Sequence, residues 1–199
     1  MRTIRIALWS VVGLVAAMLL AVGVGVARAP EATITNAVAD IGGPFTLIDQ
    51  NGKTVTRDDL LGTPHAVFFG YTFCPDVCPT TMWEMGEWVK RLEKEGKGPV
   101  TPVFVSVDPE RDTPEVLADY VSAFDRRIVA LTGTREAVDE AVSAFRAHYT
   151  INAPDERGDV LIDHTASVLL FDAAGRFRGT IAYGEDPDVA FQKLGNLAA

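Results

Sequence analysis

Two cysteines stand four positions apart, Cys74 and Cys78, and each is followed directly by a proline. The apolar run at residues 66–70 predicts a buried strand that ends just before them, and a helical pattern begins at Pro79. The N–H groups and positive dipole end of a helix N-terminus favour thiolate over thiol. The spacing predicts both sulfurs on one face of the first helical turn, with Cα atoms about 6 Å apart. Such a pair can chelate one soft metal ion or form a disulfide, and core filling is the weaker interpretation because prolines bracket the cysteines.

A chelated soft metal ion needs a third ligand, and the chain offers three histidines. His164 follows a polar, Gly- and Pro-containing stretch at residues 152–159, and a loop of this kind can carry an imidazole to a distant site. His65 stands at the opposite end of the predicted strand from the cysteines. His148 stands near the end of a predicted helix, where a basic side chain suits the dipole. We therefore predict His164 as the ligand, with structural or surface roles for the other two.

Two thiolates and one imidazole suit copper, because thiolate selects Cu(I), imidazole also suits Cu(II), and three ligands is a common number for Cu(I). Zinc would need a fourth ligand or a water molecule. The residues therefore predict one copper ion, as Cu(I), Cu(II) or both, held by the two cysteines and His164. Three carboxylates are candidates for supporting roles around these ligands, namely Asp76, Asp108 and Asp163.

The remaining pattern predicts the elements that position these residues. Strands are expected at residues 45–48, 53–56, 66–70, 100–107, 128–131, 165–171 and 177–183. Helices are expected from Pro79 to about residue 96, from Asp112 to about residue 124, from Arg135 to about residue 148, and from Asp186 to the end. Two βαβ units followed by a hairpin and a closing helix predict an α/β fold of three layers, with a central mixed sheet and helices on both faces.

The N-terminus carries an uncharged apolar run at residues 6–27. As a helix these residues would span about 33 Å, close to the hydrocarbon thickness of a bilayer. Arg2 and Arg5 precede the run, so the positive-inside rule keeps the N-terminus cytoplasmic and exports the rest. A cleaved signal peptide is the alternative, because Ala27 and Ala29 form a small-x-small site. We expect an uncleaved transmembrane anchor, since the run exceeds the about 7–15 apolar residues of a signal peptide.

This interpretation divides the chain into a membrane anchor at residues 1–29, a tether at residues 30–40 and a globular domain at residues 41–199. A mitochondrial leader would need a longer Arg- and Ser-rich segment before the apolar run. We therefore predict a single-pass protein of the bacterial inner membrane, with its globular domain on the outer, periplasmic side. That compartment is oxidising, so a close cysteine pair there needs a chemical reason.

Composition narrows the function classes further. The 199 residues are 48% hydrophobic and 23% charged, which is ordinary for a globular protein. The net charge of −9 argues against a nucleic-acid partner, which would select a basic face. Three of the 18 basic residues lie in the first 29 positions, so the exported part carries 15 basic and 27 acidic residues, a net charge of −12.

Three segments of the sequence resemble the SCO/SenC family of membrane-anchored copper proteins: FFGYTFCPDVCP at residues 68–79, VSVDPERDTP at residues 105–114 and DHTAS at residues 163–167. The resemblance implies a thioredoxin-like fold with copper bound by Cys74, Cys78 and His164. It also implies a role in maturing the binuclear copper centre of cytochrome c oxidase. The implied partners are the copper-binding subunit of the oxidase and an upstream copper donor.

Two functions fit these residues. A copper chaperone would bind the ion and pass it on by ligand exchange, and it would not be an enzyme in the strict sense. A thiol–disulfide reductase would use the redox-active pair Cys74 and Cys78, with Cys74 as the attacking thiolate, on the cysteines of the oxidase subunit. His164 discriminates between them, because a reductase has no need of an imidazole ligand for a soft metal. Peroxide reduction is a third option that nothing in the sequence specifically favours.

Overall fold

The computed structural model describes residues 9, 18–19 and 41–198 of the 199-residue chain. The predicted anchor at residues 1–29 and the tether at residues 30–40 therefore lie outside the described residues, apart from positions 9, 18 and 19. In the part of the chain that is described, no helix combines the length and the apolar character needed to cross a membrane.

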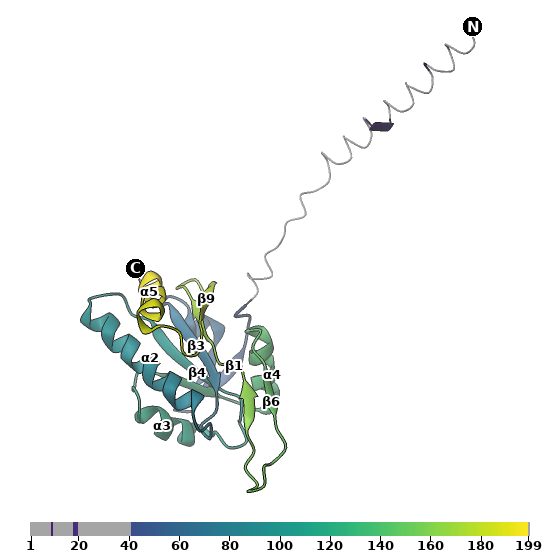
Figure 1. Ribbon diagram of the computed structural model, residues 1–199, viewed down its shortest axis with the longest axis vertical. Helices are drawn as coiled ribbons and strands as arrows, with labels where there is room; N and C mark the ends of the chain where they lie inside the picture. Colours follow the sequence, from purple (N-terminus) through teal and green to yellow (C-terminus); the bar gives the residue numbers. More distant parts are fainter. Residues whose placement is uncertain (1–8, 10–17, 20–40, 199) are drawn as a thin grey trace. The chain divides into compact units, whose positions relative to one another are not determined.

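A seven-stranded mixed sheet forms the centre of the globular domain (Figure 1), in the order β2-β1-β5-β4-β3-β8-β9. Strands β3, β4 and β5 are parallel, whereas β1, β2, β8 and β9 pair antiparallel with their neighbours. The predicted central mixed sheet is confirmed. Its strands are β1 (Thr46–Asp49), β2 (Thr54–Thr56), β3 (His65–Gly70), β4 (Thr101–Ser106), β5 (Val129–Thr132), β8 (Val168–Phe171) and β9 (Phe177–Ile181).

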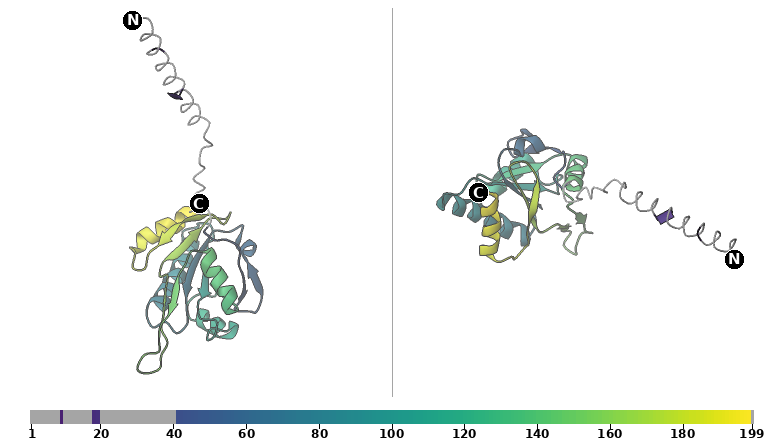
Figure 2. Two further views of the ribbon diagram at one scale, coloured as in Figure 1. Left: turned by 90° about the vertical axis from the view of Figure 1, so that its right-hand side faces the viewer. Right: turned by 90° about the horizontal axis from the view of Figure 1, so that it is seen from above.

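Helices cover both faces of the sheet, as the βαβ pattern predicts (Figures 1 and 2). The helices are α2 (Val77–Lys94), α3 (Pro114–Ser122), α4 (Arg135–Ala144) and α5 (Pro187–Leu197), with a short 3-10 helix at Arg57–Leu60 that the sequence did not predict. Helices α2, α3 and α5 lie on one face and α4 lies on the other. The fold is therefore the predicted three-layer α/β arrangement.

The central strand β3 is buried on both faces, which explains its continuous apolar sequence. Phe68 faces the α2 and α3 side, where its ring centroid lies 6.2 Å from that of Phe104. Phe69 points the other way, with its ring centroid 5.5 Å from that of Phe145, just after α4. At the amino end of β3, His65 is buried and its ring stacks on Phe171 at 5.0 Å, which is the structural role expected for it.

One predicted helix is too long. Helix α4 ends at Ala144 instead of near His148, and Arg146 has a backbone φ of 54°. That left-handed conformation stops the helix, because further α-helical hydrogen bonds would need negative φ. His148 therefore lies outside the helix, exposed, and close to Thr150 on the next strand.

A second, two-stranded sheet replaces the expected loop before the final hairpin. Strand β6 (Tyr149–Ile151) pairs antiparallel with β7 (Ile162–His164), and Tyr149 stands opposite His164. His164 is the last residue of β7, and the strand expected at residues 165–171 begins only at Val168. The polar stretch at residues 152–159 lies in the connection between these two strands. We call residues 149–164 the His hairpin.

Candidate metal centre

The carboxyl end of strand β3 provides the floor of the site. It ends at Gly70, where an added Cβ atom would lie 2.8 Å from the Cys78 Sγ atom and 2.8 Å from the Phe104 Cε2 atom. Glycine therefore lets Cys78 pack directly over the end of the strand, fully buried. This edge of a parallel sheet is where α/β proteins place their ligands.

The two cysteines lie on different elements, which corrects the prediction that both occupy the first turn of one helix. Helix α2 begins at Val77, with Asp76 as its N-cap, so Cys78 is in the first turn and Cys74 precedes the helix. The Cys74 N–H donates to the Tyr71 carbonyl oxygen at 3.3 Å, which makes a turn after the strand. The Cys78 N–H donates to the Cys74 sulfur at 3.5 Å. Cys74 thus accepts one of the N–H groups at the start of α2 and lies at its positive dipole end.

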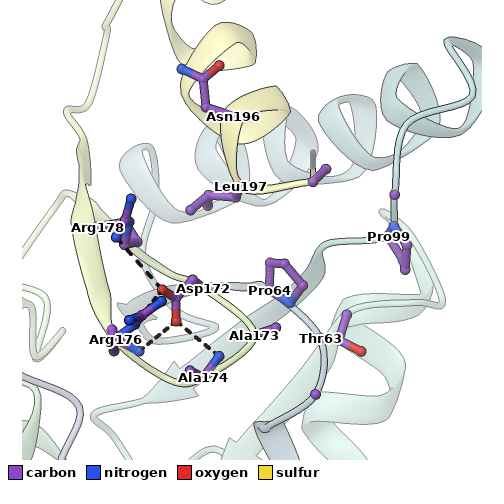
Figure 3. Close-up of a pocket in the computed structure, with 13 residues that line it drawn as sticks. Thr63, Pro64, Pro99, Asp172, Ala173, Ala174, Arg176, Arg178, Asn196 and Leu197 are labelled. Atoms are coloured by element: carbon purple, nitrogen blue, oxygen red, sulfur yellow. Dashed lines mark hydrogen bonds and ion pairs between the residues drawn. The ribbon is translucent and has the colours of Figure 1, made fainter.

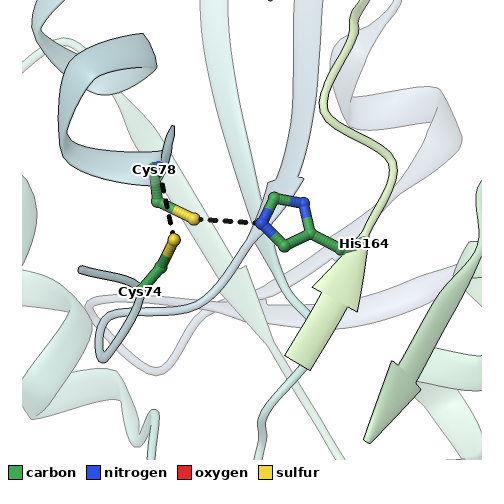
Figure 4. Close-up of side chains that lie close together, drawn as sticks. All are labelled: Cys74, Cys78 and His164. Carbon is green, nitrogen blue, oxygen red and sulfur yellow. Dashed lines mark hydrogen bonds between the residues drawn. The ribbon is translucent and has the colours of Figure 1, made fainter. Parts of the chain in front are cut away.

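His164 reaches the cysteines from the His hairpin (Figure 4). Its Nε2 atom lies 3.3 Å from the Cys78 Sγ atom, and its Nδ1 atom lies 3.1 Å from the Thr165 carbonyl oxygen. A carbonyl can only accept, so Nδ1 carries the proton and the Nε2 lone pair faces the sulfurs, as a metal-binding imidazole requires. The ring also packs edge-on against Phe68 and Tyr71, with centroids 5.7 and 5.9 Å apart.

The ligand atoms of Cys74, Cys78 and His164 all lie within 4.8 Å of one another. Both thiols are free, Cys78 is buried and Cys74 is half-buried. The three predicted ligands are therefore brought together by the fold. Two soft sulfurs and one imidazole nitrogen are the donor set that suits copper.

The two sulfurs differ in acidity. The neighbouring Cys78 side chain and the backbone N–H groups of Asp76 and Cys78 lower the pKa of Cys74 to about 3, against the effect of burial. The pKa of Cys78 is raised, first by the adjacent Cys74 sulfur and second by burial. In the metal-free protein Cys74 therefore loses its proton at a lower pH than Cys78 does.

None of the three candidate carboxylates belongs to this ligand group among the described residues. Asp76 is exposed and makes no side-chain capping bond. Asp163 is exposed and accepts from the Asn152 side chain at 3.1 Å. Asp108 is buried and pairs with Arg111. Asp76 and Asp163 line the cavity beside Cys74 and His164, and Asp108 fixes the position of Arg111.

Residues that the sequence analysis did not single out hold the loops of the site. The fully buried Asp112 carboxylate accepts from the Thr72 N–H at 3.0 Å, from the Thr72 hydroxyl at 2.6 Å and from the Ser106 hydroxyl at 2.6 Å. The Tyr71 hydroxyl accepts from the Ile162 N–H at 3.1 Å. In the sequence, Asp112 stands where a helix is expected to start, and an aspartate at that position is typical of a solvent-facing cap. Only the tertiary structure shows that its side chain faces the cysteine loop.

The site opens into a shallow cavity of about 270 Å³ lined by Cys74, His164 and the exposed side chain of Leu161. A larger cavity of about 530 Å³ lies at the opposite end of β3, beside Pro64 (Figure 3). There the Asp172 carboxylate pairs with Arg176 at 2.8 Å, and no cysteine or histidine lines it. The chemistry of the donor set, and not cavity size, identifies the first cavity as the functional one.

Fold and site together define a class: a thioredoxin-type α/β protein that presents a Cys-x-x-x-Cys pair and a distant histidine to a soft metal ion. The SCO1/SenC family model matches residues 34–199, and the chain belongs to this family.

Individual relatives agree with this assignment. Protein SenC of Rhodobacter capsulatus is 45% identical over 137 residues, which cover 69% of this chain and 61% of that protein. The mitochondrial SCO1 homolog of Homo sapiens is 42% identical over 138 residues, covering 69% of this chain and 46% of that protein. The chain thus aligns with about half to three fifths of the length of these relatives.

A solved structure of Bradyrhizobium japonicum ScoI with copper bound has a TM-score of 0.71 and 41% identity, and covers 79% of this chain and 99% of that one. Homologous structures hold copper, and this chain presents a Cys-Cys-His group with the matching donor chemistry.

Proposed function

We propose that this protein is a copper chaperone that binds one copper ion through Cys74, Cys78 and His164 and supports maturation of the binuclear copper centre of cytochrome c oxidase. The observation that carries the proposal is the convergence of these three ligand atoms within 4.8 Å from separate parts of the chain. Copper in the structures of homologous proteins supports the choice of metal. The resemblance to the SCO/SenC family supports the oxidase as acceptor.

The site has the properties that delivery of a copper ion requires. Three ligands leave a Cu(I) ion able to accept an incoming thiolate, so that the ion can pass to an acceptor by stepwise ligand exchange. Cys74 and His164 line an open cavity, whereas Cys78 is buried beneath them. An acceptor thiolate would therefore approach from the Cys74 and His164 side.

A Cu(I) titration of the reduced, metal-free protein against a chromogenic chelator tests the proposal. We expect one equivalent to bind tightly, with binding lost in Cys74→Ser and Cys78→Ser and markedly weaker in His164→Ala. His148→Ala is the matched control, because His148 is exposed and outside the ligand group. Weak Cu(I) binding by the native chain, with no difference between the native chain and His164→Ala, would contradict the proposal.

Thiol–disulfide reduction is the second candidate, and the lowered pKa of the more accessible Cys74 favours it. Cys74 thiolate would attack a partner disulfide, forming a mixed disulfide and releasing one partner thiolate. Cys78 would then displace the second partner thiolate and close the Cys74–Cys78 disulfide, so two electrons pass to the partner. In a deletion strain, rescue of oxidase assembly by added copper supports delivery, whereas rescue by reductant alone supports this second function.

The proposed location is the outer face of the bacterial inner membrane, with residues 1–29 as the anchor. The apolar run and the preceding arginines support it. Recovery of the protein in the membrane fraction after a carbonate wash is the expected result. A soluble periplasmic product beginning at Pro30 would instead establish cleavage after Ala29.

A further inference from the structure

The His hairpin is built separately from the central sheet. Strands β6 and β7 pair with each other and form their own two-stranded sheet. Each strand has three residues, and a two-stranded hairpin is marginally stable by itself. The position of His164 therefore depends on contacts between the hairpin and the rest of the domain.

Two of these contacts hold the base of the hairpin. The Ile162 N–H donates to the Tyr71 hydroxyl at 3.1 Å, and Arg135 on α4 donates to the Tyr149 hydroxyl at 2.8 Å. The first attaches strand β7 to the segment between β3 and Cys74, and the second attaches strand β6 to helix α4.

Arg111 makes a third contact with the hairpin and, unlike Arg135, it also touches the segment that carries Cys74. Its Nη2 group donates to the Val160 carbonyl oxygen of the His hairpin at 3.1 Å. Its guanidinium lies 4.8 Å from the ring centroid of Phe73, the residue before Cys74, and 5.7 Å from that of Tyr71. An arginine stacked on aromatic rings keeps its N–H groups free to donate in the guanidinium plane.

The loop that carries Arg111 is itself fixed. The Arg111 Nε group donates to Asp108, whose side chain is nearly fully buried. The next residue, Asp112, accepts hydrogen bonds from Thr72 in the cysteine loop. Arg111 thus extends from a loop that is itself fixed. Because Asp108 holds its guanidinium, Arg111 can in turn fix the position of the His hairpin.

We propose that Arg111 is a positioning residue that holds the His hairpin against the cysteine loop, and so keeps His164 within ligating distance of Cys74 and Cys78. This inference rests on the proposed metal site, because its purpose is to place the third ligand. Losing Arg111 should release the hairpin while leaving the cysteine pair in place.

The first test uses the metal-free protein and needs no copper. Arg111→Met should raise the hydrogen-exchange rate of the Ile162 amide by about tenfold or more, since a charge-assisted hydrogen bond to the hairpin is lost. Arg157→Met is the matched control, because Arg157 lies in the hairpin connection and pairs with Asp155 and Asp159. Unchanged Ile162 exchange in Arg111→Met, or an equal increase in Arg157→Met, would overturn the proposal.

The second test compares Cu(I) affinity in the native chain, Arg111→Met, His164→Ala and the double variant. A positioning residue acts through His164, so Arg111→Met should weaken binding by about 10- to 100-fold. The double variant should bind no more weakly than His164→Ala. A loss that adds to that of His164→Ala, or no loss at all, would contradict the proposal.

Arg111→Met leaves the buried Asp108 unpaired and can reduce stability for that reason alone. The double variant Asp108→Asn, Arg111→Met removes that charge. Hydrogen exchange of the Ile162 amide and Cu(I) affinity should change in this double variant as they do in Arg111→Met. If the native chain binds copper weakly, the proposed function fails, while the exchange rates still decide whether Arg111 holds the hairpin.

Discussion

The Cys78 Sγ atom and the His164 Nε2 atom lie 3.3 Å apart although 86 positions separate them in the sequence. Cys78 comes from the first turn of α2 and His164 from the end of β7. Their contact joins the main sheet, through the helix that follows β3, to the separate two-stranded sheet. Any change that moves either support should therefore alter the ligand group before it unfolds the domain.

Gly70 supports the cysteine side of this contact. We expect Gly70→Ala to destabilise the domain by about 1–3 kcal/mol, because its Cβ atom would lie 2.8 Å from both Cys78 Sγ and Phe104 Cε2. Displacement of Cys78 should also weaken Cu(I) binding. Urea denaturation and the copper titration measure the two effects.

Gly43→Ala is the control for that substitution. Its Cβ atom would lie 3.5 Å from the Ala144 Cβ atom, which is an ordinary contact. We expect a change in the free energy of unfolding within about 0.5 kcal/mol. Equal stability of the two alanine variants would show that Gly70 has no steric role.

Cys74 should react with alkylating reagents much faster than Cys78. Since the pKa of Cys74 is lowered to about 3, its thiolate is fully formed at every pH well above that value. Its alkylation rate should therefore stay flat from about pH 5 to pH 8, where an ordinary thiol of pKa about 8.5 speeds up tenfold per pH unit. Cys78 is buried with a raised pKa and should stay unmodified. Mass spectrometry of iodoacetamide-treated, metal-free protein measures both rates.

Cys78→Ala tests the cause of that difference. The Cys78 side chain is the largest contribution to the lowered pKa of Cys74, so its removal should raise that pKa. The alkylation rate of Cys74 should then fall as the pH is lowered toward 5. A rate that remains flat in the variant would assign the lowered pKa to the backbone N–H groups instead.

Much of this architecture is predictable from the sequence because its signals are local. Residues 66–70 form one continuous apolar run because β3 is buried on both faces. Pro114 marks a helix start, and α3 begins there. The nearness of the cysteines to the end of β3 follows from adjacency in the chain.

The His hairpin was not predictable because its stability comes from distant residues. Ile151 is half exposed, and three-residue strands carry too few positions for a periodic pattern. The hydroxyl of Tyr71 and the side chain of Arg135 hold the hairpin from elsewhere in the chain. The sequence nevertheless predicts that His164 lies beside the two cysteines, and the structure places it there. That prediction needs only the donor chemistry of the side chains, and not the path of the chain between them.

Asp112 should contribute strongly to stability through the cysteine loop. Asp112→Ala leaves the Thr72 N–H and the Ser106 hydroxyl without their buried acceptor, so we expect a loss of about 1–3 kcal/mol or more. Asp112→Asn keeps one acceptor oxygen and should lose less. Urea denaturation measures the free energy of unfolding of the two variants. Hydrogen exchange of the Thr72 amide should also be faster in Asp112→Ala than in the native chain. Asp119→Ala, at an exposed position of α3, is the control. Native stability in Asp112→Ala would mean that water replaces the carboxylate.

His65 should make stability depend on pH near neutrality. Burial lowers its pKa, against the effect of the Thr63 carbonyl, so the folded protein takes up this proton at a lower pH than the unfolded chain does. Between the two pKa values the unfolded chain binds more protons, and stability falls as the pH drops below about 6.5, by at most about 1.4 kcal/mol per pH unit.

The variant His65→Phe tests this pH dependence, because it keeps a ring to stack on Phe171 but cannot titrate. The difference in the free energy of unfolding between the native chain and this variant should therefore shrink as the pH falls from 7 to 5. The exposed His148→Phe is the control and should leave the slope unchanged. Urea denaturation at each pH measures that difference. If it stays constant from pH 7 to pH 5, His65 has the same pKa in the folded and the unfolded protein, and the prediction is wrong.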